Sequence, residues 1–322
     1  MTPYSKNTDP FSSWRLIFFG SSSFAIPALE ALKNSPDDVV VVVTAPPAPQ
    51  GRGQNKSRVP VANWALNHGL LLIEPTNPNS SELADWFASL KPDLVVVAAF
   101  GSFLGSKLLS LGRTTPINLH PSLLPRHRGP APINWALIQG DKRIGVSTMQ
   151  LVKEMDAGPI LQQFSLVPTP ADISAGKMEE ILAERGAELL LSTIMGIKKG
   201  SLSPKPQDQS EVTINPLLKK QDGFLNFSLP AKKLANLING VDPWPGATCE
   251  FNNKRIKFFN ASFRPGQGDP GKVLGLSEAG KLEIGTGEGI LLVSSLHPEG
   301  KNRQNATDFY NGYRPSFFST LV

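Results

Sequence analysis

Continuous runs of β-branched and aliphatic residues alternate with helix-like segments through the first two-thirds of this chain. Val39–Thr44 and Leu94–Ala99 are such runs, and strands of this kind are typical of parallel sheets that are buried on both faces. Glu82–Leu90 lies between them with helical spacing, behind an N-cap candidate at Ser80 or Ser81. Strand, helix and strand repeated in this order predict a doubly wound, mostly parallel α/β sheet.

Other segments extend the same alternation. We expect further strands at Trp14–Phe19, Leu71–Ile73, Pro116–Leu119, Gly145–Val152 and Ile160–Val167, and further helices at Phe24–Leu32, Val61–Asn67 and Ala175–Lys199. Gly200 is placed to end the last helix, because glycine readily adopts the left-handed conformation found after helix C-termini.

The pattern changes after Gly200. Leu202–Ser210 is rich in Ser, Pro, Lys and Gln without periodicity, which is typical of a linker. One helical segment and several short strands follow, namely Ala231–Asn239, Thr248–Asn252, Arg255–Ala261, Gly271–Gly275, Lys281–Gly285 and Ile290–Leu296. We therefore expect a first domain over residues 14–200, a linker over 201–214, and a smaller β-barrel domain of the OB-like type over 215–322.

The net charge of +5 is concentrated near the C-terminus. Residues 217–322 hold 13 Lys and Arg against 9 Asp and Glu, whereas the preceding residues hold 19 against 18. A basic second domain is consistent with a polyanionic partner. A merely solvated basic surface explains the same excess, and both interpretations stay open here.

The composition bears on the cellular compartment of the protein and on whether it spans a membrane or binds a metal. The chain has 322 residues and a single cysteine, Cys249, so no intrachain disulfide is possible and we expect a cytoplasmic protein. Met1–Ser13 resembles neither a secretory signal nor a transit peptide, and no aliphatic run is long enough to cross a bilayer. Four histidines without tight spacing give no indication of a metal site.

The segment Ile117–Pro125 carries the clearest chemical signal. Asn118 and His120 are two residues apart at the end of an apolar strand, so both side chains leave by the same face. They lie at the carboxyl edge of the predicted sheet, where open α/β folds bind ligands. An amide donor beside an imidazole meets two needs of acyl transfer, an oxyanion partner and a proton carrier. Either residue alone is more often structural.

A carboxylate in a later turn completes the candidate site. Asp156 lies in Met155-Asp156-Ala157-Gly158-Pro159, where an aspartate usually just forms the turn. If the chain brings Asp156 to His120, the carboxylate orients the ring and favours the charged imidazolium.

At this point the sequence resembles a known family, that of the 10-formyltetrahydrofolate-dependent formyltransferases. The resemblance rests on Asn118-Leu119-His120-Pro121-Ser122-Leu123-Leu124-Pro125 with the Asp156 turn behind it, and extends from about Leu16 to Tyr313. It includes Phe19-Gly20-Ser21-Ser22-Ser23-Phe24-Ala25 and Asp242-Pro243-Trp244-Pro245-Gly246-Ala247.

This resemblance implies the roles of the site residues. Asn118, His120 and Asp156 are then catalytic, and the folate-binding residues are Ser122, Leu123, Leu124 and Pro125. The implied co-substrate is 10-formyltetrahydrofolate, with no metal and no covalent enzyme intermediate. Arg126-His127-Arg128 follows this loop; contact with phosphates or with the acidic folate tail and a solvated basic turn remain equal alternatives for it.

The acceptor amine is suggested by a second resemblance. Residues 45–58 resemble the basic loop of the family members that formylate methionyl-tRNA, with Gly51-Arg52-Gly53 as the best match. Glycines allow close approach to a nucleic acid, and Arg52, Lys56 and Arg58 can meet phosphates. The implied partner is the initiator methionyl-tRNA, and we expect a monomer that binds no membrane. An amino-sugar nucleotide acceptor is the alternative, because such enzymes can keep a similar second domain.

Other functional classes fit the sequence less well. A nicotinamide-dependent oxidoreductase would carry a dinucleotide-binding motif in the first strand-to-helix turn. That turn reads Gly20-Ser21-Ser22-Ser23-Phe24-Ala25 and lacks the later glycines of the motif. A non-catalytic RNA-binding protein has no need of the Asn118, His120 and Asp156 set. A formyltetrahydrofolate hydrolase uses a similar trio and releases formate without any acceptor.

Overall fold

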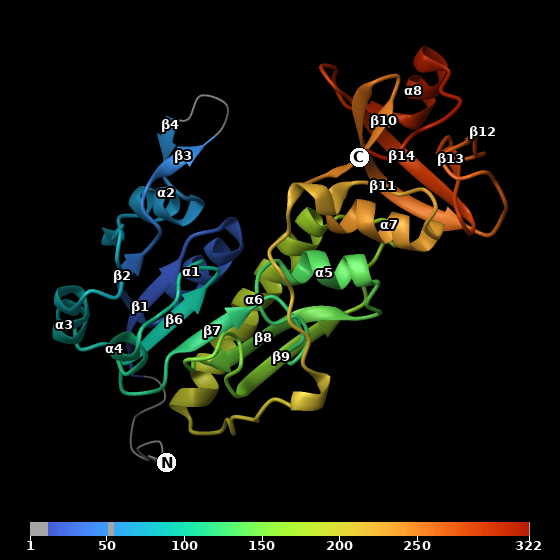
Figure 1. Ribbon diagram of the computed structural model, residues 1–322. Coiled ribbons are helices and arrows are strands. Elements are labelled where there is room, and N and C mark those ends of the chain that lie inside the picture. Colours follow the sequence, from blue (N-terminus) through green and yellow to red (C-terminus); the bar gives the residue numbers. More distant parts are fainter. Residues whose placement is uncertain (1–11, 51–54, 322) are drawn as a thin grey trace. The chain divides into compact units, whose positions relative to one another are not determined.

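The computed structural model describes residues 12–50 and 55–321. The chain divides into two compact units, shown in Figure 1. The first comprises Met1–Arg128, Gly145–Ser165 and Glu180–Ile214, and the second comprises Gly129–Ile144, Leu166–Glu179 and Asn215–Val322.

The first unit is built on a seven-stranded sheet in the order β5-β2-β1-β6-β7-β8-β9. Its strands are β1 (Arg15–Gly20), β2 (Asp38–Val43), β5 (Leu72–Ile73), β6 (Leu94–Ala98), β7 (Ile117–His120), β8 (Ile144–Gln150) and β9 (Ile160–Leu166). The pairs from β5 through β7 are parallel, whereas β7 and β8 are antiparallel. The predicted mostly parallel sheet is confirmed.

Helices follow the strands of this sheet. The sequence pattern predicted η1 (Ser23–Ala25), α1 (Ile26–Lys33), α2 (Pro60–Asn67), α3 (Ser81–Ser89) and α6 (Ala175–Lys198), but it did not predict α4 (Ser106–Leu109). Ser80 is the N-cap of α3, and its hydroxyl accepts a hydrogen bond from Leu83 N. Gly200 has a φ of 63° just beyond α6, as a left-handed C-terminal glycine should.

The sheet of the first unit is covered on both faces. Leu16 and Ile17, which point to opposite faces of β1, are both fully buried. One of these faces carries an aromatic cluster in which the ring of Phe19 meets those of Phe87 and Phe100 edge-on at 5.6 and 5.2 Å. Dense burial of this kind keeps the strand ends, and the residues they carry, in fixed positions.

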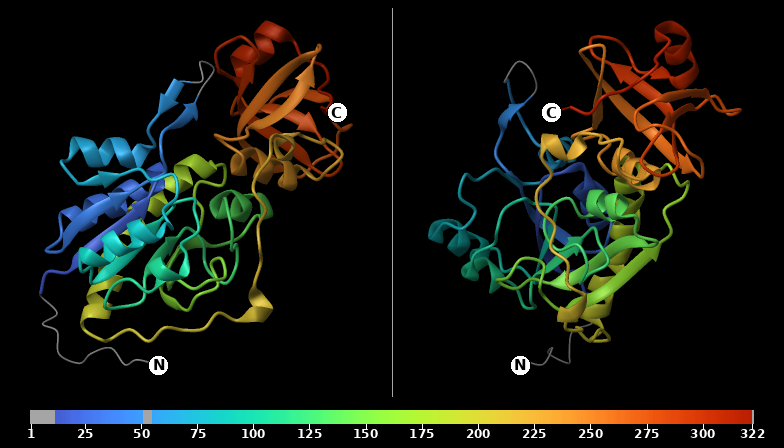
Figure 2. Two further views of the ribbon diagram at one scale, coloured as in Figure 1. Left: turned by 60° about the vertical axis from the view of Figure 1, so that its left-hand side comes forward. Right: turned by 45° about the vertical axis from the view of Figure 1, so that its right-hand side comes forward.

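A two-stranded arm leaves the first unit after β2. Its strands β3 (Ala48–Gln50) and β4 (Asn55–Ser57) pair antiparallel, and both views in Figure 2 show the arm projecting from the body of the unit. Arg52 lies outside the described residues.

The second unit contains an antiparallel sheet and its helices. The path of the sheet is β10-β11-β14-β13-β12, and β15 pairs with β14. Its elements are α5 (Pro132–Gln139), η3 (Lys220–Gly223), α7 (Ala231–Gly240), β10 (Ala247–Phe251), β11 (Lys254–Arg264), β12 (Val273–Leu276), β13 (Leu282–Gly285), β14 (Ile290–Pro298), β15 (Gln304–Asn305) and α8 (Ala306–Tyr313). Closure into an OB-like barrel stays a prediction.

Helix α8 was not expected from the sequence. Its residues Thr, Asp, Phe, Tyr, Asn and Gly are weak helix formers. The side chain of Asn305 caps the helix by accepting from Asp308 N at 2.7 Å, and Phe309 is fully buried. The cap and tertiary packing therefore outweigh the intrinsic preference of the segment.

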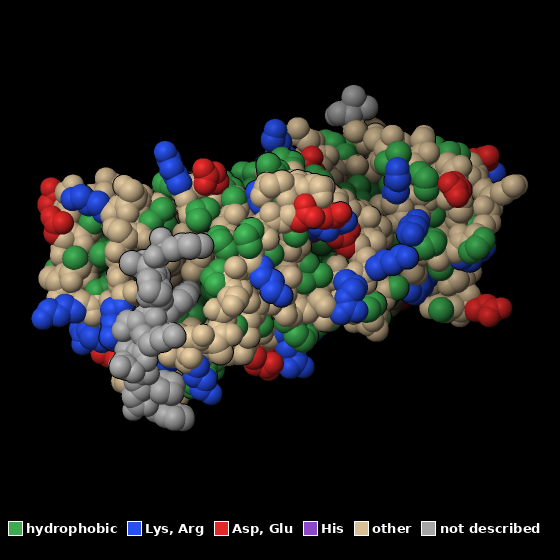
Figure 3. Space-filling view, turned by 90° about the horizontal axis from the view of Figure 1, so that it is seen from below, with side chains coloured by type: hydrophobic (Ala, Val, Ile, Leu, Met, Phe, Trp, Pro, Cys, Tyr) green, Lys and Arg blue, Asp and Glu red, His purple; other side chains and the backbone are tan. Residues whose placement is uncertain are grey.

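Basic side chains do not form one continuous patch on the face drawn in Figure 3. Lys and Arg lie there at several separate places, with Asp and Glu among them. No helix among the described residues is both long and apolar enough to span a membrane.

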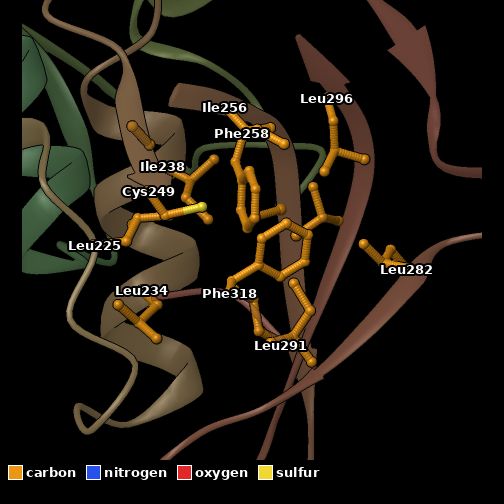
Figure 4. Close-up of a cluster of buried hydrophobic side chains, with 14 of the residues drawn as sticks. Leu225, Leu234, Ile238, Cys249, Ile256, Phe258, Leu282, Leu291, Leu296 and Phe318 are labelled. Carbon is orange, nitrogen blue, oxygen red and sulfur yellow. The ribbon is translucent and has the colours of Figure 1, made fainter. Parts of the chain in front are cut away.

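Phe318 lies at the centre of the core of the second unit (Figure 4). It is 1% exposed, and its ring lies 5.2 Å from that of Phe258 and 5.5 Å from that of Phe251. The α7 residues Leu234 and Ile238 belong to the same cluster.

We predict that Phe318→Ala destabilises this unit by about 3–5 kcal/mol, because it removes a buried ring and leaves a cavity. The neighbouring Phe317 is 52% exposed, so Phe317→Ala serves as the control and should change stability far less. Urea unfolding monitored by circular dichroism compares the two. Equal losses in both variants would contradict the central role of Phe318.

Candidate active site

Strand β7 carries two of the three residues expected to be catalytic. Asn118 pairs with Val97 of β6 on one side and with Met149 of β8 on the other. Asn118 and His120 are 8% and 5% exposed, respectively. The strand ends at His120, since Pro121 has no N–H to continue the ladder. Both side chains therefore leave the sheet on one face, at a position set by two neighbouring strands.

Asp156 is brought to His120 from 36 positions further along the chain. It lies in the turn between β8 and β9, and its Oδ1 is 3.7 Å from Nδ1 of His120. The two side chains are 14% and 7% exposed. A carboxylate this close to a buried imidazole helps to orient the ring.

The other ring nitrogen of His120 is also engaged. Nε2 lies 3.0 Å from the carbonyl oxygen of His127, and because a carbonyl can only accept, Nε2 must donate. Both ring nitrogens thus face oxygen acceptors, and these two contacts restrict the orientation of the ring.

The amide of Asn118 is available. Within residues 12–50 and 55–321 it has no hydrogen-bond partner, and it is not among the atoms sealed from solvent. A polar side chain that stays unpaired this close to a His–Asp pair is ready to donate to a ligand oxygen.

The loop after β7 is held by its own hydrogen bonds. Ser122 is buried, and its hydroxyl donates to the carbonyl oxygen of Arg126 at 2.8 Å. The hydroxyl of Ser147 donates to the carbonyl oxygen of Ser122 at 2.6 Å and accepts from Leu124 N at 3.2 Å. Ser122 therefore shapes the loop, while Leu123 and Pro125 are only half-buried. Folate binding by Ser122, Leu123, Leu124 and Pro125 stays a prediction.

Arg126-His127-Arg128 divides into an exposed and a buried part. Arg126 is exposed, but His127 and Arg128 are 2% and 8% exposed. Arg128 Nε donates to Oε1 of Gln207 at 2.9 Å, and its Nη2 has no partner among the described residues. Because His127 and Arg128 are buried, the alternative of a solvated basic turn does not apply to these two residues.

Sequence reasoning missed Gln207, which supports the Asp156 turn. Its Nε2 donates to the carbonyl oxygens of Asp156 and Gly158 at 2.7 and 2.8 Å. No motif announces it, because it lies in the aperiodic segment that we expected to be a linker.

Of the three residues expected to contact tRNA, the structure describes Lys56, on β4, and Arg58, just after β4. Lys56 is exposed on β4. Arg58 is about half exposed, and its Nε is 3.0 Å from Oε2 of Glu74. Their role stays a prediction, as does that of Arg52 outside the described residues.

Metal ligation and thiol chemistry find no support in the described residues. The described residues contain no group of three or more His, Cys, Asp or Glu side chains arranged to hold a metal ion. Burial raises the pKa of the Cys249 thiol well above its ordinary value, so this cysteine stays protonated and is a poor nucleophile.

Known proteins resemble this chain over most of its length. The family model described as "Formyl transferase" matches residues 14–194, and that described as "Formyl transferase, C-terminal domain" matches residues 217–314. The chain is 43% identical over 302 residues to the methionyl-tRNA formyltransferase of Desulfotalea psychrophila, and 93% of each chain is covered.

Solved structures show the same fold at low sequence identity. The N-formyltransferase from Helicobacter canadensis, in complex with folinic acid and dTDP-3-aminofucose, superposes with a TM-score of 0.65 at 16% identity, covering 88% of this chain and 99% of that one. HypX from Aquifex aeolicus in complex with tetrahydrofolic acid gives 0.62 at 19% identity, with 93% of this chain matching 47% of that one, about half its length.

We predict that Gly158→Ala disrupts the Asp156 turn. A Cβ at Gly158 would lie 1.7 Å from the carbonyl oxygen of Gln150, so the backbone must shift. Gly312→Ala in α8 is the control, since a Cβ there meets nothing within 4 Å and alanine favours a helix. Thermal unfolding should show a clear loss for Gly158→Ala and none for Gly312→Ala; an unchanged Gly158→Ala melting curve would show that the turn adapts.

Proposed function

This chain belongs to the formyl transferase family, within the group of methionyl-tRNA formyltransferases, and on that premise we propose that it transfers a formyl group from 10-formyltetrahydrofolate to the α-amino group of initiator methionyl-tRNA. The observation that carries this proposal is the 3.7 Å approach of Asp156 to His120, two residues from the unpaired amide of Asn118. The relative that is 43% identical favours this acceptor over an amino-sugar nucleotide. We further propose that the protein acts as a monomer in the cytoplasm.

The folate supplies an activated formyl group, so no covalent enzyme intermediate is required. Asn118 donates its amide N–H to the formyl oxygen, on which negative charge develops as the amine nitrogen attacks the formyl carbon. Such a donor stabilises the transition state more than the ground state, and removing one typically costs about 10²–10³ in rate.

His120 manages the proton that the reaction must move. The attacking amine loses a proton, and the departing N10 nitrogen must gain one as the bond between N10 and the formyl carbon breaks. In this proposal the Nε2 proton of His120 leaves the carbonyl oxygen of His127 for N10, and Nε2 then takes the proton that the attacking amine loses, while Asp156 keeps the ring oriented. The half-buried apolar residues Leu123 and Pro125 are suited to contact the pterin ring.

The acceptor is decided by a direct comparison. With 10-formyltetrahydrofolate as donor, we expect formylation of charged initiator tRNA and much slower reaction with charged elongator tRNA and with an amino-sugar nucleotide. Preference for the sugar nucleotide would replace the proposed acceptor. Release of formate at the same rate without any amine would indicate a hydrolase.

We predict that Asn118→Ala and His120→Ala each lower kcat by at least about a hundredfold while the proteins stay folded. His68 is exposed at the C-cap of α2, so His68→Ala is the matched control and should keep normal turnover. Single-turnover formylation rates and circular dichroism test this. A near-normal rate in either site variant would remove the assignment.

Lys56 offers a separate test of the tRNA-binding arm. If its ammonium neutralises one phosphate, Lys56→Ala reduces the slope of log K against log salt by about 1 and leaves folate binding unchanged. Lys33 is also exposed but lies on α1, so Lys33→Ala should keep the original slope. Equal slopes for wild type and Lys56→Ala would exclude Lys56 from the contact.

A further inference from the structure

Both oxygen acceptors around His120 belong to residues with an uncommon backbone conformation. Asp156 has a φ of 52° and His127 a φ of 59°, in the left-handed region that non-glycine residues rarely occupy. Local preference alone does not keep two such residues in place, so contacts from elsewhere must hold them. The contacts described below come from one segment, residues 205–214, which we call the strap.

The strap is first fixed to the edge of the sheet next to the Asp156 turn. Lys205 and Ile160 exchange two backbone hydrogen bonds, each 2.8 Å long. Ile160 is the first residue of β9 and directly follows the turn. This pairing sets the register with which the strap passes the turn.

Gln207 then holds the turn itself. Its side chain is buried, with 6% of the residue exposed, and its amide nitrogen donates to the carbonyl oxygens of Asp156 and Gly158. Arg128 donates to the amide oxygen at 2.9 Å, which fixes which way the amide faces. A side-chain amide has two N–H groups and one oxygen, and all three are used here.

Thr213 holds the other acceptor. Its Oγ1 accepts a hydrogen bond from His127 N at 2.7 Å, and its carbonyl oxygen accepts from Arg128 N at 2.9 Å. The carbonyl of His127, which receives the proton of His120 Nε2, is therefore set by the same strap that sets Asp156. One segment reaches both sides of the imidazole.

We propose that the strap is a positioning element for formyl transfer, in which Gln207 and Thr213 set the two acceptors that orient His120. Neither residue is expected to touch the substrates; they act through Asp156 and His127. The kinetic part of this proposal rests on the proposed function, whereas its structural part can be tested without any substrate.

The structural test observes the His120 ring directly. The chain has four histidines, so ¹⁵N-labelled histidine gives a simple spectrum, in which His120→Ala identifies the His120 signals. Gln207→Met keeps the length of the side chain and removes both donors, and we expect it to shift the His120 ring resonances. Gln209 is exposed on the same strap, and its amide donates to the backbone carbonyl of Gln207 at 3.1 Å but not to the Asp156 turn. Gln209→Met is therefore the control and should leave the resonances in place.

A background variant separates positioning from general disturbance. On Asp156→Asn, the added Gln207→Met should cause a much smaller shift of the His120 signals, because the carboxylate through which Gln207 acts is gone. Thr213→Val removes the hydroxyl while keeping its shape, and it should shift the signals as well. Thr213→Ser retains the hydroxyl and should restore the wild-type spectrum, which keeps the test decisive if Gln207→Met fails to fold.

The kinetic test compares the effect of each variant on kcat with its effect on the KM for folate. A misplacement of about 1 Å can cost about 10²-fold in rate, so we expect Gln207→Met to lower kcat roughly 10- to 100-fold. The KM for folate should stay within about threefold, since ground-state binding is not affected. Thr213→Val should lower kcat more than Thr213→Ser.

Three results would overturn the proposal: unchanged His120 resonances in Gln207→Met, equal shifts in Gln207→Met and Gln209→Met, or equal behaviour of Thr213→Val and Thr213→Ser. Wild-type protein that formylates no amine refutes the proposed function instead, while the resonance comparison still decides the role of the strap.

Discussion

The candidate site depends on how the His120 imidazole is held. One ring nitrogen faces a carboxylate oxygen at 3.7 Å and the other donates to a backbone carbonyl at 3.0 Å. A buried ring held between two acceptors keeps one orientation. Proton transfer demands such a group, since a freely rotating imidazole spends little time in line with donor and acceptor.

The sheet sets the position of the His120 ring, but it does not set the positions of the two oxygen acceptors that the ring faces. β7 lies between β6 and β8 and is buried, so the positions of Asn118 and His120 follow from regular strand pairing. Asp156 and His127 stand in irregular backbone on either side, each with a positive φ. Regular structure thus places the two side chains proposed to be catalytic, while hydrogen bonds between distant segments place the groups around them.

Much of the fold of the first unit could be predicted from the sequence because the features that determine it are local. The β-branched runs, the N-cap at Ser80 and the glycine after α6 each act within a few residues, and the structure confirms them. Side chains along a strand alternate between its two faces, so Asn118 and His120 were predicted to share a face. The doubly wound sheet was predicted from the order of strands and helices. The approach of Asp156 to His120 could not be predicted from the sequence, since nothing in a turn sequence specifies a contact with a residue 36 positions away. The weak helix α8 escaped notice because burial of Phe309 and a cap, not propensity, create it.

The strap was beyond the reach of sequence reasoning for a physical reason. An aperiodic segment with Ser, Pro and Gln has the composition of a linker, and composition reports how a segment interacts with water, not which carbonyl its amide meets. The segment also falls between the two matched family regions, which end at 194 and resume at 217. Yet Gln207 is 6% exposed and uses both donors on the turn that carries Asp156. A buried amide with every hydrogen bond satisfied is costly to replace, so the short stretch between two recognisable regions can determine the geometry of the site within one of them.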